Sequence, residues 1–449
     1  AMHGNELGVS ATFVTNPKKP ALGPGRDPAP LPIRPSSQAA QSWTATPAEQ
    51  QKFTERLKSG LEDEGQTLLA VAYRAHEVRI RISNQRYRTV AQSVGRSARV
   101  LARVMPAPIQ TFVIEPVVND LPTSSVVVQR GDLEQLENRV GASERLFDKT
   151  DFTAAGLNTG LTKVTNDTPR LTYGLAPYIA TGFFDPSSPI RAELGVSAGA
   201  QLRIAQGLTF GGSVRKSIVG NLSERDEPPE SNGLPIVRSD AAVYNRFGDP
   251  SLSNLALQYL FRASPNIYGR VTAGYLERGY GGFSSELLWK PVDRRLALGA
   301  EVNYAKKRDY DGGFGFQDYD VVTGHVSAYY PFSNGFYGQV DAGRFLAGDY
   351  GATISFDRVF ENGWRVGAYA TFTDATAEEF GEGSFDKGIR IVAPIDWVLG
   401  RPDARSVTAS VRSLTRDGGA RLKVSNRLYS LIEDSHRAGL EEDWGRFWK

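Results

Sequence analysis

The stretch LALGAEVNY at residues 296–304 alternates apolar and polar side chains, and this pattern decides the fold. Leu296, Leu298 and Val302 fall on one face of an extended chain, whereas Glu301 and Asn303 fall on the other. Successive side chains of a β-strand point to opposite faces of its sheet, so a period of two residues is typical of a strand. The stretch therefore predicts a strand with one apolar and one polar face.

The same alternation recurs from about residue 170 to the end of the chain. It is clear at residues 191–203, 267–275 and 364–373, and turn residues separate the segments. Further segments of this kind start near Leu171, Leu208, Leu255, Phe283, Val321, Phe336, Ala352, Ile389, Val407 and Leu422. We predict about fourteen antiparallel strands, with about 12 or about 16 as alternatives, because bacterial outer-membrane barrels have even strand numbers.

Two folds explain such alternation, a soluble β-sandwich and a transmembrane β-barrel. The inward faces of a sandwich are closely packed with large aliphatic and aromatic residues. Here the apolar faces are rich in Ala and Gly and end in aromatic residues such as Tyr275, Tyr304 and Trp364, as in an interfacial belt. The segments also reach the roughly 9–11 residues that a membrane-crossing strand needs. We therefore predict a mainly β protein with a transmembrane antiparallel β-barrel, preceded by a small α/β domain.

Composition agrees with this class and excludes others. The 449 residues include 18 Tyr, 22 Phe and 46 Gly, a balance typical of a barrel with aromatic girdles and a wet interior. A net charge of +2 is too small for a nucleic-acid binder. The absence of Cys excludes disulfides and thiolate sites. The mean hydropathy of −0.33 excludes a bundle of hydrophobic helices.

Three parts are predicted along the chain. Residues 1–58 hold the opening AMHGNE, which resembles an expression tag, then a Pro-rich linker and a short helix that begins with Thr46 as its N-cap. Residues 59–145 are a soluble α/β domain, and residues 165–449 are the barrel with a C-terminal tail. No signal peptide is visible, so we expect the chain to be a fragment of a longer, exported precursor.

The α/β domain is predicted from strand and helix patterns that follow one another. Strands are expected at residues 68–71, 78–82, 111–118 and 124–129, with helices at 88–104 and 132–139. The first of these helices and its approach carry a basic side formed by Arg86, Arg88, Arg96, Arg99 and Arg103. This side is either a solvated face or a binding surface for an anionic partner.

Turn signals orient the predicted barrel. Residues 333–335 (SNG) and 361–363 (ENG) are hairpin signals and indicate the end with short turns. The longest interruption, Ser217–Asp249, is expected to be an extracellular loop or a loop folded into the lumen.

The polar faces of the predicted strands carry charges of both signs. Our candidates for substrate-binding residues in the lumen are Arg203, Arg215, Arg262, Arg270, Glu301, His325 and Arg365. Such a lining suits binding or passage of a polar polymer. Internal ion pairs that only stiffen a barrel would give the same sequence.

The densest acidic cluster, at residues 378–387, supplies a second set of candidates: Glu379, Glu382 and Asp386. Glycoside cleavage needs two carboxylic acids, one as acid and one as base or nucleophile. Adjacency in sequence does not establish their spacing, and a solvated loop between two strands is the preferred interpretation. No metal or cofactor is predicted, because no two of the four His residues are spaced as ligands and no phosphate loop is present.

Several short stretches resemble the YjbH/GfcD family. They are YLERGYGG at 275–282, KRDY at 307–310, TGH at 323–325, GRFLAGD at 343–349, FGEGSFDKG at 380–388 and WGRFW at 444–448. NQRY at 84–87 and VGRSAR at 94–99 resemble the domain that precedes the barrel in this family. The resemblance covers most of residues 60–449. Its members carry an exported, often Cys-anchored N-terminal region, which we expect to lie outside this fragment.

The resemblance implies an outer-membrane protein that takes part in secretion of exopolysaccharide or group 4 capsule. The α/β domain would face the periplasm. Expected partners are the polysaccharide, outer-membrane lipid and periplasmic proteins of the same export system, without nucleic acid. Enzymatic activity is not expected. Two alternatives stay open, a polysaccharide-modifying enzyme similar to a glycoside hydrolase and a purely structural outer-membrane scaffold.

Overall fold

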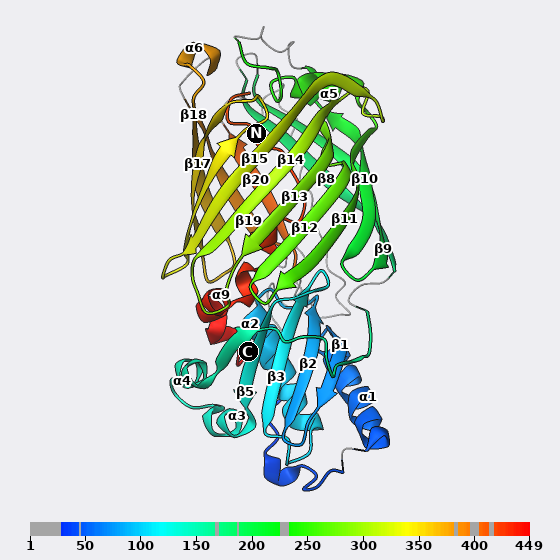
Figure 1. The fold of residues 1–449 in the computed structure, drawn as a ribbon, viewed down its shortest axis with the longest axis vertical. Coiled ribbons are helices and arrows are strands. Elements are labelled where there is room, and N and C mark those ends of the chain that lie inside the picture. The colour runs from blue at the N-terminus through cyan, green and yellow to red at the C-terminus, as the bar shows by residue number, and fades with distance from the viewer. Residues whose placement is uncertain are drawn as a thin grey trace, which may run out of the picture.

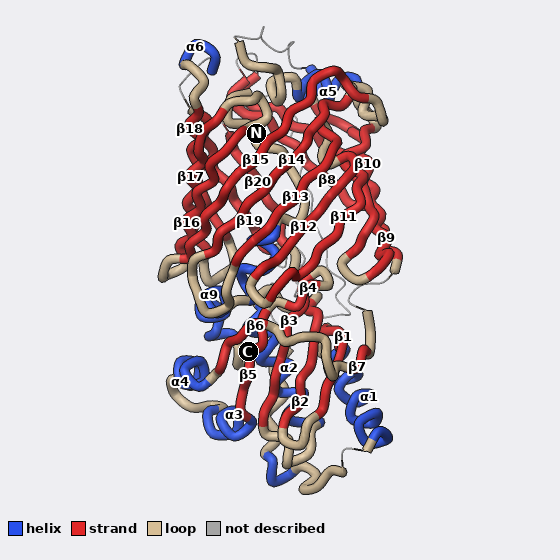
Figure 2. Tube along the Cα trace, in the orientation of Figure 1, coloured by secondary structure: helices blue, strands red, loops and turns tan. Residues whose placement is uncertain are grey.

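The computed structural model contains a small α/β domain and a large antiparallel sheet, which lie end to end (Figure 1). It describes residues 28–44, 46–166, 170–185, 188–224, 233–380, 385–395, 404–412 and 417–449. Strands make up most of the large sheet, and most helices gather around the small domain (Figure 2). None of the helices in the described ranges is long and apolar enough to span a membrane.

The α/β domain is built on a seven-stranded sheet of order β6-β5-β3-β2-β1-β7, with β4 paired to β3. Its strands are β1 (Gln66–Tyr73), β2 (Glu77–Asn84), β3 (Thr111–Val118), β4 (Leu121–Pro122), β5 (Ser124–Gln129), β6 (Asp151–Ala154) and β7 (Thr162–Lys163). Its helices are η1 (Ser36–Gln38), α1 (Pro47–Asp63), α2 (Val90–Val104), α3 (Arg130–Leu136) and α4 (Ala142–Lys149). β2 and β3 pair in parallel because α2 crosses over between them.

Local signals explain where the helices of this domain begin. The Thr46 side chain accepts a hydrogen bond from the Glu49 N–H, as the predicted N-cap requires, and Pro47 occupies the first turn. Leu57 and Leu61 of α1 are fully buried in the core that also holds the apolar side of α2. The helix α1 therefore belongs to the hydrophobic core of the α/β domain.

The large sheet has thirteen described strands in chain order, from β8 to β20, each antiparallel to its neighbours. They are β8 (Leu171–Asp185), β9 (Ser188–Ala205), β10 (Leu208–Gly220), β11 (Ser251–Ser264), β12 (Ile267–Tyr275), β13 (Tyr280–Trp289), β14 (Ala297–Arg308), β15 (Phe316–Pro331), β16 (Phe336–Arg344), β17 (Tyr350–Val359), β18 (Arg365–Thr373), β19 (Asp386–Pro394) and β20 (Ser406–Arg412). This number is one fewer than the fourteen strands that we predicted.

The strand predicted to start near Leu422 is wrong. Residues 420–427 contain no strand, and they lie against the side of the sheet that carries its polar residues. Leu422 is buried in an apolar cluster, whereas Arg421 pairs with Glu301 and Asp341 of the sheet. Both sides of this stretch are therefore occupied by protein, so its alternation does not mark a strand with a free apolar face.

The sheet is polar where it is buried and apolar where it is exposed. Along β14, Leu298 and Val302 are 46% and 57% exposed, whereas Glu301 and Asn303 are 3% and 0% exposed. The buried side, here called the inner face, carries most of the charged residues of the strands, and the other side is the outer face. A soluble sandwich has the opposite distribution, with apolar residues buried between its sheets. The predicted alternation of faces is confirmed.

The inner face is covered by the C-terminal segment, residues 417–449. This segment contains α8 (Leu428–Ile432), η3 (Glu433–Ser435), α9 (Arg437–Asp443) and η4 (Trp444–Arg446). Leu428 and Ile432 pack against Tyr268 and Leu288 of the sheet, and further along Trp444 and Phe447 enter the core of the α/β domain. In Figure 1 the C-terminus lies beside α2, with α9 between the two parts of the molecule.

The long connection between β10 and β11 also turns toward the inner face. It contains η2 (Leu222–Glu224) and α5 (Ala241–Phe247), and residues 225–232 lie outside the described ranges. Val237 is buried with Leu422 and Tyr280, and Asp240 pairs with Lys307 at 2.6 Å. Of the two predicted arrangements for this connection, the described part follows the one that folds inward. A short helix α6 (Ala377–Phe380) follows β18 at the same end of the sheet (Figure 1).

Candidate functional site

A buried ion-pair network joins the C-terminal segment to the inner face. Arg270 of β12 is 0% exposed and pairs with Glu286 at 2.9 Å and with Glu301 at 3.3 Å. Arg427 donates two hydrogen bonds of 3.0 Å to Glu301, and Arg421 pairs with Asp341 at 2.8 Å. A buried charge is costly unless it is paired, so these partners hold one another in place. The network holds the C-terminal segment across β12 to β16.

The start of the C-terminal segment is held by backbone groups of the inward-folded connection. Asp417 accepts hydrogen bonds from the backbone N–H groups of Val237, Arg238 and Ser239 at 2.8, 2.7 and 3.0 Å, and from the Ser239 hydroxyl at 2.7 Å. Charge-assisted hydrogen bonds of this kind are about twice as strong as neutral ones. The connection and the C-terminal segment therefore form one unit inside the sheet.

The end of the C-terminal segment is bound by α2. Arg96 Nε donates to the carbonyl of Lys449 at 2.8 Å, and Arg99 Nη2 donates to the carbonyl of Trp448 at 3.1 Å. Arg96 also pairs with Glu64 at 3.1 Å. Arg96 and Arg99 are 1% and 4% exposed. These two arginines are thus neither a solvated face nor a surface for an anionic partner, which corrects both interpretations of the basic helix for these positions.

Between the two parts of the molecule, the C-terminal segment contains a fully buried histidine. His436 Nε2 lies 3.2 Å from the hydroxyl of Tyr268, which donates to the carbonyl of Thr123 at 3.0 Å. Burial, together with the nearby Lys290 ammonium, lowers the pKa of His436 to about 3. Burial also lowers the pKa of Lys290 to about 8. The junction therefore contains a histidine that is neutral at physiological pH.

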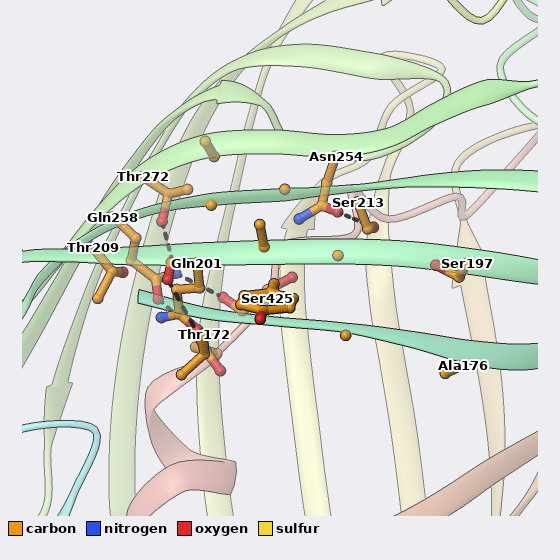
Figure 3. Close-up of a pocket in the computed structure, with 18 of the residues that line it drawn as sticks. Thr172, Ala176, Ser197, Gln201, Thr209, Ser213, Asn254, Gln258, Thr272 and Ser425 are labelled. Atoms are coloured by element: carbon orange, nitrogen blue, oxygen red, sulfur yellow. Dashed lines mark hydrogen bonds between the residues drawn. The ribbon is translucent and has the colours of Figure 1, made fainter. Parts of the chain in front are cut away.

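A cavity of about 590 Å³ remains beside the C-terminal segment, along the inner side of β8 to β12 (Figure 3). Most of its wall consists of small and neutral polar residues. It is lined by Thr172, Tyr173, Gly174, Leu175, Ala176, Ser197, Gly199, Ala200, Gln201, Thr209, Gly211, Gly212, Ser213, Asn254, Ala256, Gln258, Thr272, Leu276, Arg405, Ser425 and Asn426. Its size is within the ~300–1,000 Å³ that is usual for ligand sites. We take this cavity as the candidate functional site.

The polar groups of this cavity are in part paired with one another. Gln258 donates to Thr272 at 3.2 Å and accepts from Asn426 at 2.7 Å, so the C-terminal segment fixes this amide (Figure 3). In the described part of the chain, the side chains of Gln201 and Thr209 have no hydrogen-bond partner. Free amide and hydroxyl groups that face a cavity can donate to and accept from a ligand.

The predicted lumen residues of the central strands lie on the inner face, and their charges are already paired. Arg270 and Glu301 belong to the buried network. Arg365 pairs with Asp357 at 2.9 Å and with Glu433 of the C-terminal segment at 2.7 Å. His325 is 3% exposed and packs edge-on against Phe345, and neither of its ring nitrogens has a hydrogen-bond partner among the described residues.

The predicted lumen residues near the two ends of the sheet contact other parts of the chain. Arg203 forms a bidentate pair with Asp120 of the α/β domain at 2.6 and 2.8 Å. Arg215 donates to Asn245 of α5 at 3.2 Å. Arg262 donates to the carbonyl of Ala155 at 2.7 Å. None of the seven predicted residues lines the cavity.

The acidic candidates lie at the end of the sheet beyond β18. Glu379 accepts from the N–H of Thr376 at 2.8 Å and from its hydroxyl at 3.0 Å, which is a helix-capping arrangement. Asp386 begins β19, and Glu382 lies outside the described residues. Among the residues described, no group of three or more His, Asp or Glu could hold a metal ion.

The sequence interpretation missed both the cavity and the residues that hold the C-terminal segment. Thr172 of β8 and Ser197 and Gln201 of β9 fall at inner-face positions of their strands, so the alternation could have identified them as inward-facing. These residues are neutral, whereas the predicted lumen residues are Arg, Glu and His. The ion pairs of Arg421 were not predicted because a strand was expected to start near Leu422.

The fold and the cavity define a class of protein. In this class a large antiparallel sheet has an apolar outer face and a polar inner face, the C-terminal segment lies against the inner face, and an α/β domain is attached. The chain belongs to the YjbH family, whose model, described as "Exopolysaccharide biosynthesis protein YbjH", matches residues 1–434. The family resemblance predicted from the motifs is thereby confirmed.

The comparisons also include one curated relative and one solved structure. "Uncharacterized lipoprotein YjbH" of Escherichia coli (strain K12) is 30% identical over 361 residues, covering 78% of this chain and 51% of the relative. The chain thus spans about half the length of that relative. OmpTdeltaL8, a loop L8 deletion mutant of OmpT, an outer membrane protein of Vibrio cholerae, matches 50% of this chain and 87% of its own at 11% identity. Its TM-score of 0.26 is too low to support an argument.

Proposed function

We propose that this protein is a closed transmembrane β-barrel of the bacterial outer membrane that docks a secreted exopolysaccharide in its interior cavity. The observation that carries this proposal is the neutral polar cavity inside a sheet whose outer face is apolar. Membership of a family described by exopolysaccharide biosynthesis supplies the class of polymer.

Closure of the sheet is supported by its two edges. Residues of the first strand, β8, and Arg405, which directly precedes the last strand, β20, line the same cavity. An odd number of antiparallel strands makes β8 and β20 run in the same direction, so closure joins them in parallel. Barrels with an odd strand number exist in mitochondria. Closure also removes the unpaired backbone edge that lipid does not tolerate.

The membrane position is supported by the outer face and the turns. Exposed aliphatic residues such as Val326 and Ile354 would contact outer-membrane lipid. The two short turns predicted from sequence contact the rest of the chain at the end nearest α2: Arg88 donates to the carbonyls of Glu361 and Asn362, and Gly335 N–H donates to Glu442. Short turns of outer-membrane barrels face the periplasm, so the α/β domain would lie there, beside the periplasmic partners of the export system.

Docking is favoured over free passage because the C-terminal segment lies along the inner face from Asp417 to the α/β domain. A polymer that meets the cavity would contact a wall formed jointly by the sheet and by Ser425 and Asn426. The buried network explains the charged inner residues without a substrate, so we place the binding role on the neutral residues of the cavity.

The test fills the cavity without disturbing the strand. A Cβ added to Gly174 meets nothing within 4 Å, so Gly174→Trp places its ring in the cavity. Ile179→Trp is the matched control, because Ile179 is 75% exposed at an outward-facing position of the same strand and does not line the cavity. The measurement is the amount of polymer secreted by cells that carry the full-length variant as their only copy.

We expect Gly174→Trp to reduce secretion at least about tenfold, the change that ~1.4 kcal/mol of lost binding produces. Ile179→Trp should secrete normally, and both should run faster on unboiled than on boiled gels, as a closed barrel does. Normal secretion by a folded Gly174→Trp protein would refute docking in the cavity. Identical mobility of boiled and unboiled wild-type protein would refute closure.

A further inference from the structure

We infer that the cavity accepts an uncharged, hydroxyl-rich segment of polysaccharide rather than an acidic one, an inference that rests on the docking function proposed above. It starts from the composition of the wall. Of the 21 described residues that line the cavity, one, Arg405, carries a charge. The others are Ser, Thr, Asn, Gln, Gly and a few apolar or aromatic residues. The described wall of the cavity therefore offers a ligand hydrogen bonds and very little net charge.

Charged residues are abundant near the cavity, but they form ion pairs and hydrogen bonds with other protein groups. At the end of the cavity nearest the α/β domain, Arg203 is neutralised by Asp120 at 2.6 Å. At the other end, Glu193 accepts from the Tyr178 hydroxyl at 2.7 Å. Glu301, on the far side of the C-terminal segment, is engaged by three arginines. The neutral wall is thus a local property of β8 to β12 in a sheet that is otherwise rich in ion pairs.

Hydrogen-bond chemistry matches this wall to sugar hydroxyls. The Gln201 amide provides two donors and an acceptor, and the Thr209 hydroxyl provides both kinds of group. A sugar hydroxyl donates and accepts in the same way, so each contact can be completed without a counter-ion. A carboxylate-bearing segment would lose its hydration and find one cation, and burying a charge with incomplete pairing is costly.

The sign of an introduced charge tests the inference, whatever sugar the polymer contains. The side chain of Gln201 lines the cavity and has no hydrogen-bond partner within the described chain, so Gln201→Glu and Gln201→Lys add opposite charges at one position with little change in volume. Gln201→Met, which adds none, is the matched control. The readouts are the amount of polymer secreted by cells with each full-length variant and the uronic-acid content of that polymer.

For an uncharged segment we expect the Glu and Lys variants to secrete equally, within about threefold, whether that level is normal or reduced. An acidic segment would be repelled by Glu and attracted by Lys, and a unit charge at contact distance separates the two by at least about tenfold. Such a difference, or a polymer rich in uronic acid, would overturn the inference while leaving docking intact. Normal secretion by Gly174→Trp overturns docking itself, so the two failures are distinguishable.

Discussion

A single methyl group added to α2 tests how the C-terminal segment is held. Gly95 lies in the middle of α2, where its backbone touches the last turn of the chain. A Cβ at this position would lie 1.9 Å from the carbonyl oxygen of Phe447, 2.7 Å from its carbonyl carbon and 3.0 Å from its Cα. The obstacle is backbone, so no side-chain rotation relieves the overlap. Gly95→Ala must therefore push the C-terminal segment away from α2.

Two opposing terms set the size of this effect. Alanine is favoured over glycine in a helix by about 1 kcal/mol. Overpacking a close contact costs about 1–3 kcal/mol, and the rigid obstacle points to the upper end. The net result is a loss of about 2 kcal/mol in the free energy that holds the C-terminal segment against α2. That loss raises the fraction of detached segment about thirtyfold.

Hydrogen–deuterium exchange of the full chain measures this opening directly. The amides of residues 437–449, among them Leu440 and Phe447, are hydrogen-bonded within the segment and should exchange about thirtyfold faster in Gly95→Ala. Gly131→Ala is the matched control, since a Cβ on Gly131 of α3 meets nothing within 4 Å. This control should leave exchange unchanged or slow it.

The direction of the change in exchange distinguishes the two possible effects of the added methyl group. If Gly95→Ala leaves the exchange of these amides unchanged or slows it, helix propensity governs the site and α2 does not hold the C-terminal segment. Acceleration in Gly95→Ala without acceleration in Gly131→Ala supports the contact as described.

Three further predictions concern the groups that hold the C-terminal segment. Phe447→Ala removes a ring that is 1% exposed and should weaken the attachment of the C-terminal segment to the α/β domain by about 3–5 kcal/mol, measured as faster hydrogen–deuterium exchange of residues 437–449. Phe247→Ala removes a ring that is 64% exposed and should change this free energy by less than about 0.5 kcal/mol. Glu301→Ala removes the carboxylate that Arg270, Arg421 and Arg427 share and should lower the free energy of unfolding by about 3–5 kcal/mol, measured by urea titration; an unchanged midpoint would contradict the network. Because the pKa of His436 is lowered to about 3, its contribution to stability is complete above pH ~6.5 and decreases toward pH 3, by about 2 kcal/mol at pH 5. His436→Phe should flatten this dependence in thermal unfolding at pH 7.5 and 5, and an equal slope in both proteins would contradict the assignment.

Strand positions and the two faces of the large sheet could be predicted from sequence because they depend on local alternation. Leu298 and Glu301 are separated by an odd number of residues, and in a strand this spacing alone places them on opposite sides of β14. The caps of α1 and the periodic face of α2 are likewise local, so both helices were predicted close to their observed bounds.

The role of each inner residue depended on which parts of the chain meet inside the sheet. The stretch around Leu422 has the alternation of a strand, yet its two sides contact other protein, so only the tertiary structure distinguishes it from a lipid-facing strand. The alternation in the sequence places both Arg270 and Gln201 on the polar face of their strands. The C-terminal segment completes the ion pairs around Arg270, whereas it leaves a cavity beside Gln201. Ion pairs and packing contacts depend on distance in space, which the order of residues along the chain does not give.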